Sequence, residues 1–89
     1  MAALYGFAYT EKALDFLETL PPKFRRQIRT KIEALASDPL PPSHKLIHEM
    51  SQHGESVYRI RSGDYRVLYV VRDVTVVILD IDHRKDVYR

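Results

Sequence analysis

The sequence predicts an α+β fold in which two antiparallel helices pack on one face of a small, mainly antiparallel sheet. Its elements are expected in the order strand, helix, helix and three strands, and strands segregated from helices in this way favour that class. Clean alternation over 57–61 and the largely apolar runs over 65–72 and 75–81 predict three consecutive strands. No segment repeats, and the 89 residues are expected to form one domain, 1–89, around a single modest core.

The first half of the chain is expected to supply a short strand and both helices. Residues 4–9 predict the strand, and Thr10 is a suitable N-cap for the helix that follows. Pro21 and Pro22 end that helix, and Pro22 can also open the second one, which is expected to stop near Asp38 before a proline-rich connector. Residues 44–55 are mostly polar and are expected to form a loop with one docked turn. Two apolar stripes have helical spacing: Ala13, Leu14, Phe16, Leu17 and Leu20, then Phe24, Ile28, Ile32 and Leu35.

The most informative stretch is 57–71, which predicts a tight hairpin turning at Gly63-Asp64. If Ser62 pairs with Tyr65, three arginines share one side of the sheet, and Arg61 faces Arg66. The three are Arg59, Arg61 and Arg66. The other side is expected to face the core with Tyr58, Ile60, Val67 and Tyr69. Clustered like charges cost stability unless an anion binds, so this side predicts phosphate contact, with a solvated sheet face as the alternative.

The next turn, at Asp73-Val74, predicts that the arginine side is also partly apolar. Pairing Arg72 with Thr75 would place three apolar residues of the last strand beside Leu68. These are Val77, Leu79 and Ile81. A slip of one residue would exchange the two faces of that strand. Two helices can cover only one face, so a partner chain or the C-terminal tail is expected to cover the apolar part of the other.

Composition excludes several classes of protein. The chain has no cysteine, which rules out disulfides and cysteine-based zinc sites. The first ten residues lack the basic start of a signal peptide, and no window approaches the roughly 20 apolar residues of a membrane span. A soluble cytoplasmic protein without membrane contact is therefore expected. The formal charge of +2 is too mild to indicate nucleic acid by itself.

Three histidines raise the alternative of a metal site. His44 and His48 stand four residues apart, which would bring them together on a helix, and His53 is a third candidate. The preceding prolines disfavour a helix there, and no cysteine or carboxylate set completes a coordination shell. No metal and no cofactor are therefore expected.

The C-terminal segment adds chemical groups where the last strand ends: His83, Arg84 and Tyr88. Cutting RNA without a metal requires a base for the 2′-hydroxyl proton, cations for the pentavalent phosphorane and an acid for the leaving oxygen. Arginine supplies only the cation, because its guanidinium stays protonated. His83 and Tyr88 are therefore the candidates for proton transfer, and histidine is the better base near neutrality.

The runs YRIRSGDYRVLYVV and VVILDIDHRKDVYR resemble the RelE/ParE toxin superfamily, especially its RelE-like messenger-RNA interferase branch. Element order, the proline-rich connector, the basic hairpin and the histidine-arginine-tyrosine tail extend the likeness over nearly the whole chain. The resemblance implies a RelE-like microbial RNase-type fold and the toxin of a type II toxin-antitoxin system. Such a toxin cuts messenger RNA in the ribosomal A site, without metal, by 2′-hydroxyl attack. Its implied partners are the ribosome, messenger RNA and a RelB-like antitoxin in a hetero-oligomer.

The site residues that the resemblance implies are Arg59, Arg61, Arg66, His83, Arg84 and Tyr88. The best-studied family pattern has lysines where this chain has Arg59 and Arg61, and one of them is a proposed base. Arginine cannot take that proton, so His83 becomes a stronger candidate for the general base. Two alternatives remain: a ParE-like toxin that poisons DNA gyrase by binding only, and a homologue that does no more than bind an antitoxin.

Overall fold

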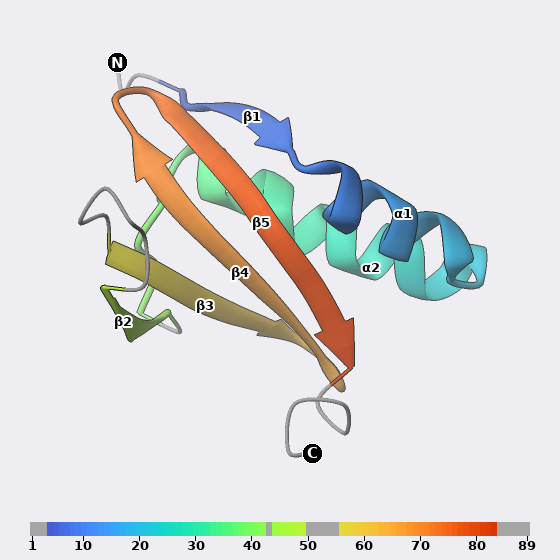
Figure 1. The fold of residues 1–89 in the computed structure, drawn as a ribbon. Helices are drawn as coiled ribbons and strands as arrows, with labels where there is room; N and C mark the ends of the chain where they lie inside the picture. Colours follow the sequence, from blue (N-terminus) through green and yellow to red (C-terminus); the bar gives the residue numbers. More distant parts are fainter. Residues whose placement is uncertain (1–3, 43, 50–55, 84–89) are drawn as a thin grey trace.

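A computed structural model describes residues 4–42, 44–49 and 56–83 of the chain. Its elements are β1 (Gly6–Tyr9), α1 (Glu11–Thr19), α2 (Pro22–Glu33), a 3₁₀ turn (Ala34–Ala36), β2 (Lys45–Glu49), β3 (Ser56–Ser62), β4 (Tyr65–Arg72) and β5 (Thr75–His83). In this part of the chain the strands form one sheet in the order β1-β5-β4-β3-β2, and both helices lie against one of its faces (Figure 1). Only the β1–β5 pair is parallel among these neighbours. The predicted α+β class is confirmed.

The start of α1 is fixed by its cap, as the sequence predicted. The Thr10 hydroxyl oxygen accepts a hydrogen bond from the Ala13 amide at 3.2 Å and donates one to the Leu79 carbonyl at 2.7 Å. One side chain therefore satisfies an amide of the first helical turn and also ties the helix to β5.

The second helix begins at Pro22 and ends at Glu33, and the 3₁₀ turn carries the chain on to Ala36. A proline at the first helical position loses no hydrogen bond, since that amide has no partner within a helix. The connector that follows is held to the sheet by the Tyr69 hydroxyl, which donates to the Pro39 carbonyl at 2.7 Å. The helix and its stop were predicted to within a few residues.

The prediction of a loop over 44–55 is wrong for its first part, because Lys45–Glu49 forms β2. This strand pairs antiparallel with β3, with Leu46 opposite Tyr58, and its register shifts between Leu46 and His48. The local sequence carries only weak strand propensity, so the unpaired edge of β3 supplies the hydrogen bonds that make it a strand. Residues 50–55, the rest of the predicted loop, lie outside the described residues.

The hairpin between β3 and β4 has the predicted register. Ser62 pairs with Tyr65, Arg61 with Arg66 and Arg59 with Leu68. Gly63 in the turn has a φ of 60°, a conformation that glycine adopts at little cost. Turn chemistry and alternation agree here, and together they fix which side chains share a face.

The second hairpin starts in the predicted register and then departs from it. Arg72 pairs with Thr75 as expected, but the register shifts between Leu68 and Tyr69, so that Leu79 becomes an extra residue in β5. Beyond this bulge the faces exchange, and Ile81 belongs to the core instead of the arginine side. The prediction for Ile81 is therefore wrong. Burial of Ile81 under the helices is the physical gain that an unbroken register would forfeit.

The core lies between the helices and the sheet. Both helices and strands contribute, and the largest fully buried side chains among the described residues are Leu17, Ile28, Ile32, Leu35, Val67, Tyr69, Val70, Val76, Ile78 and Ile81. All of these except Val70 belong to one contiguous cluster. The predicted core face of the first hairpin is confirmed, because Ile60, Val67 and Tyr69 are in the cluster and Tyr58 packs against it.

Candidate nucleic-acid interface

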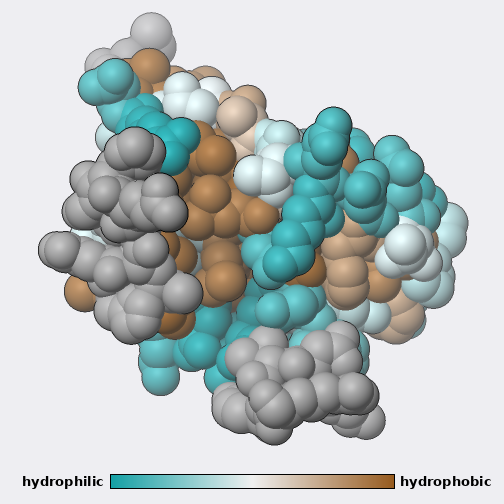
Figure 2. Space-filling view, viewed as in Figure 1, coloured by the Kyte–Doolittle hydropathy of each residue, from teal (hydrophilic) through white to brown (hydrophobic). Residues whose placement is uncertain are grey.

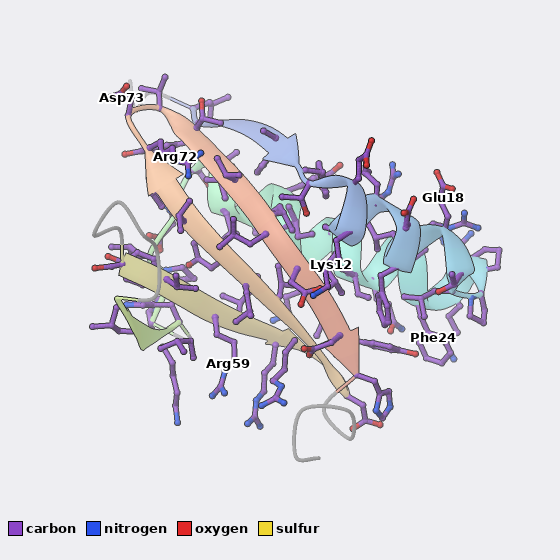
Figure 3. All side chains as sticks on the ribbon, in the orientation of Figure 1. Lys12, Glu18, Phe24, Arg59, Arg72 and Asp73 are labelled. Carbon is purple, nitrogen blue, oxygen red and sulfur yellow. The ribbon has the colours of Figure 1, made fainter. Side chains whose placement is uncertain are left out.

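The sheet face turned away from α1 and α2, here called the open face, carries most of its charge in two rows across the strands. Direct strand pairing defines them as Lys45–Arg59–Leu68–Asp80 and Arg61–Arg66–Asp82. Figure 3 shows the Arg59 side chain projecting from β3, below the sheet in that view. The three arginines predicted to share a face therefore do so, at the end of the sheet where β3 and β4 turn.

The three arginines differ in exposure. Arg61 is exposed and Arg59 is half-buried, whereas Arg66 keeps only 4% of its surface. The Arg66 Nε lies 3.7 Å from a carboxylate oxygen of Asp82 on the neighbouring strand. This carboxylate offsets part of the repulsion between Arg61 and Arg66, and it holds one guanidinium in a fixed place on the open face.

The acidic side of the open face was missed from the sequence. Asp80 and Asp82 reach it only because the bulge at Leu79 exchanges the faces of β5. Asp80 also forms an ion pair with Lys12 of α1, with 3.2 Å between Asp80 Oδ2 and Lys12 Nζ. This ion pair links the open face to α1 (Figure 3). The available signal was the alternation of Leu79, Asp80, Ile81 and Asp82, because burying Ile81 would send both aspartates to the other side.

His83 lies at the end of β5 but on the helix side of the sheet. It pairs directly with Tyr65, and the two rings meet edge to face with centroids 5.2 Å apart. Tyr65 also packs against Phe16 of α1 and Phe24 of α2, which identifies the side. Arg66 and Asp82, one residue earlier on each strand, face the opposite way. The structure thus brings the three arginines together and leaves His83 at the rim beyond them.

The two remaining predicted site residues, Arg84 and Tyr88, lie outside the described residues. Their roles stay predictions. In sequence, Arg84 directly follows His83, and Tyr88 is the fifth residue after it.

His44 and His48, the two described histidines considered for metal binding, do not share a helix. His44 precedes β2, packs its ring on Tyr58 with centroids 5.6 Å apart, and places Nδ1 2.6 Å from the Pro41 carbonyl oxygen. His48 belongs to β2, where residues four apart do not form the adjacent pair that a helix would give. His53 lies outside the described residues.

The fold and the basic sheet face define a small α+β protein with a cationic surface, and comparison with known proteins gives its family. A family model described as the ParE toxin of the type II toxin-antitoxin system parDE matches residues 7–88. The chain therefore belongs to this family, within the RelE/ParE superfamily. The resemblance stated from the sequence is confirmed at this level.

Individual relatives point to the RelE branch. Toxin RelG of Mycobacterium tuberculosis is 34% identical over 88 residues, which cover 96% of this chain and 97% of the relative. The RelBE2 toxin-antitoxin complex of the same organism contains a chain that superposes with a TM-score of 0.75 at 30% identity, over 94% of this chain and 95% of that one. A chain of the archaeal RelE-RelB complex from Pyrococcus horikoshii OT3 superposes with a TM-score of 0.77 at 26% identity, over 91% of this chain and 96% of that one.

In the described part of the chain, neither helix has the length and hydropathy of a membrane span.

Proposed function

We propose that this toxin is a ribosome-dependent endoribonuclease that cuts messenger RNA in the ribosomal A site and so inhibits translation in the cytoplasm. The observation that carries the proposal is the convergence of Arg59, Arg61 and Arg66 on one face at one end of the sheet. The RelE names of the relatives support the same branch of the superfamily.

In the proposed reaction, the 2′-hydroxyl oxygen of one nucleotide attacks the adjacent phosphorus. The bond from phosphorus to the 5′-oxygen of the next nucleotide breaks, which leaves a 2′,3′-cyclic phosphate and a free 5′-hydroxyl. Charge builds on the non-bridging oxygens, and the arginines stabilise it through their planar, bidentate donors. The proposed reaction uses no metal, and the ribosome presents the message to the toxin.

Among the three arginines, Arg66 is the best placed to act as a fixed donor. Its burial and its ion pair with Asp82 remove the freedom of a long side chain, so less entropy is lost when a phosphate binds. Arg61 is exposed and is free to approach the same phosphate from the neighbouring strand. We assign charge stabilisation to these two residues and to Arg59.

Proton transfer is assigned to the rim where β5 ends. His83 and Tyr88 are the titratable candidates there, and Arg84 adds a further cation. The position of His83 on the helix side favours an approach from the end of the sheet rather than across the open face. A pH–rate profile of the wild type against His83→Ala identifies the base, because loss of one limb of the profile would assign that limb to His83.

We further propose that a RelB-like antitoxin holds the toxin inactive in a hetero-oligomeric complex. Two structural relatives are toxin-antitoxin complexes. Apolar residues gather at the centre of the open face, over β4 and β5 (Figure 2). Leu68 and Val77 are half-buried in this part of the sheet, and an antitoxin segment seated there would bury their remaining surface. Val70, between them, is already buried.

A ParE-like toxin that poisons DNA gyrase by binding only is the second candidate, and the description of the matching family model favours it. Primer extension on messages isolated after toxin induction separates the two. We expect breaks phased with the reading frame, because A-site cleavage follows the codons. Growth arrest with intact messages and DNA damage would favour gyrase poisoning. Absence of growth arrest would leave a homologue that only binds an antitoxin.

A further inference from the structure

A groove of about 360 Å³ opens at the edge of the sheet, and the described residues that line it are all basic. They come from three elements: Lys31 of α2, Lys45 of β2, and Arg59 and Arg61 of β3. Lys45 stands directly opposite Arg59, and Arg61 follows two residues later on the same side of β3. The groove thus begins on the open face and continues around the sheet edge to α2.

Three of the four basic residues that line this groove, Lys31, Lys45 and Arg61, differ from Lys12 and Arg66 in their counter-charges. Lys12 and Arg66 each have an aspartate of β5 within ion-pair distance. Among the side chains that the structure describes, no carboxylate lies at that distance from Lys31, Lys45 or Arg61. Lys31, Lys45 and Arg61 therefore add positive charge to one groove, and a polyanion bound there would relieve the repulsion between like charges.

The size and position of the groove favour the backbone of an RNA strand as its occupant. Its volume of about 360 Å³ lies at the lower end of the range of small-ligand sites. Arg59 and Arg61 belong both to the groove and to the open face, so a strand with one phosphate at Arg66 is led past them toward Lys45 and Lys31. Lysine ammonium groups contact phosphates as point charges and read no base.

We propose that this groove binds phosphates that flank the cleaved one on the same RNA strand, with Lys31 and Lys45 as the added contacts. The inference rests on the proposed function for the identity of the strand. The groove then adds RNA affinity that is the same for all RNA sequences and that weakens as salt increases. Arg66 separately stabilises the charge that develops on the cleaved phosphate.

The test measures binding without cleavage. A fluorescent single-stranded 2′-O-methyl RNA lacks the attacking hydroxyl, and its anisotropy with the purified full chain is recorded over a series of salt concentrations. The double variant Lys31→Gln/Lys45→Gln is compared with Lys23→Gln/Arg26→Gln, which removes the same charge from exposed positions of α2 outside the groove. Thermal melting checks that both variants remain folded.

We expect the groove variant to bind more weakly than the wild type. The plot of log K against log salt has a negative slope, and its magnitude should fall by about 1.4 in this variant, at about 0.7 for each lost phosphate contact. The control variant is expected to keep the wild-type slope. Equal slopes for wild type and groove variant, or an equal fall in both variants, would overturn the proposal. The proposal would also be overturned if the groove variant lost binding to polyglutamate but kept its RNA binding, because the groove would then be a site for an acidic protein segment.

Failure of the groove and failure of the proposed nuclease activity are distinguishable in this design. A wild type that shows the expected slope but cuts no message on ribosomes supports the groove and refutes the nuclease. A wild type that cuts messages, with a groove variant that binds as tightly as it does, refutes the groove and leaves the nuclease standing.

Discussion

Arg66→Ala is expected to lower ribosome-dependent cleavage by about 10² to 10³-fold, the loss that follows removal of one preorganised donor from a developing oxyanion. The physical reason is that Arg66 is the most buried of the three arginines and is fixed by Asp82, so no neighbouring side chain can take its position. The measurement is the rate of message cleavage on ribosomes, with growth arrest on induction as a second readout.

Two further variants separate this effect from misfolding. Arg66→Lys keeps the charge beside Asp82 but loses the planar fork, and we expect it to stay folded with an intermediate rate. Arg72→Ala removes an exposed arginine from the other end of β4 and is expected to leave the rate unchanged. Full activity in folded Arg66→Ala would remove Arg66 from the proposed site.

Tyr69→Ala is expected to cost about 3–5 kcal/mol of unfolding free energy, as other aromatic truncations in cores do. Tyr69 has no exposed surface, and its hydroxyl donates to the Pro39 carbonyl, so the variant loses packing and a tie to the connector together. Domains of this size are stable by only about 5–15 kcal/mol, so this loss is a large fraction of the total and is expected to raise the ratio of unfolded to folded protein by more than about a hundredfold. Chemical denaturation of the purified protein measures the loss.

Tyr69→Phe isolates the hydrogen bond and is expected to cost about 1 kcal/mol at neutral pH. Burial raises the pKa of Tyr69 well above its usual value, with Tyr58 and Asp38 adding to the rise. Because the unfolded tyrosine ionises near pH 10, the stability that Tyr69 contributes is complete below that pH and is lost as the pH rises further. The gap between wild type and Tyr69→Phe should therefore narrow above about pH 10. A constant gap up to pH 11 would contradict this account.

The sequence predicts the first hairpin well because its determinants are local. Gly63 supplies the turn, and the alternation around it places Arg59, Arg61 and Arg66 on one face. The helices are equally local, since Thr10 and the prolines mark their ends. These features depend on residues within one or two turns of each other, which is the range over which sequence patterns carry their information.

Other features depend on contacts between distant segments. Strand β2 forms because β3 offers an unpaired edge, and its own residues give little sign of it. The bulge at Leu79 exchanges the faces of β5 so that Ile81 is buried, and only then does Asp82 meet Arg66. The basic groove likewise needs α2, β2 and β3 in their final arrangement before Lys31 approaches the arginines. Such features follow from packing rather than from local propensity.

The central claim is that the toxin cuts messenger RNA only in the ribosomal A site. The most direct test incubates the purified toxin with ribosomes stalled on a defined codon, and with the same message free in solution, and then analyses the ends of the products. We predict a cut within the A-site codon that leaves a 2′,3′-cyclic phosphate and a 5′-hydroxyl, with the free message intact. An uncut A-site codon, equal cutting of the free message, or products ending in a 3′-hydroxyl and a 5′-phosphate would contradict the claim.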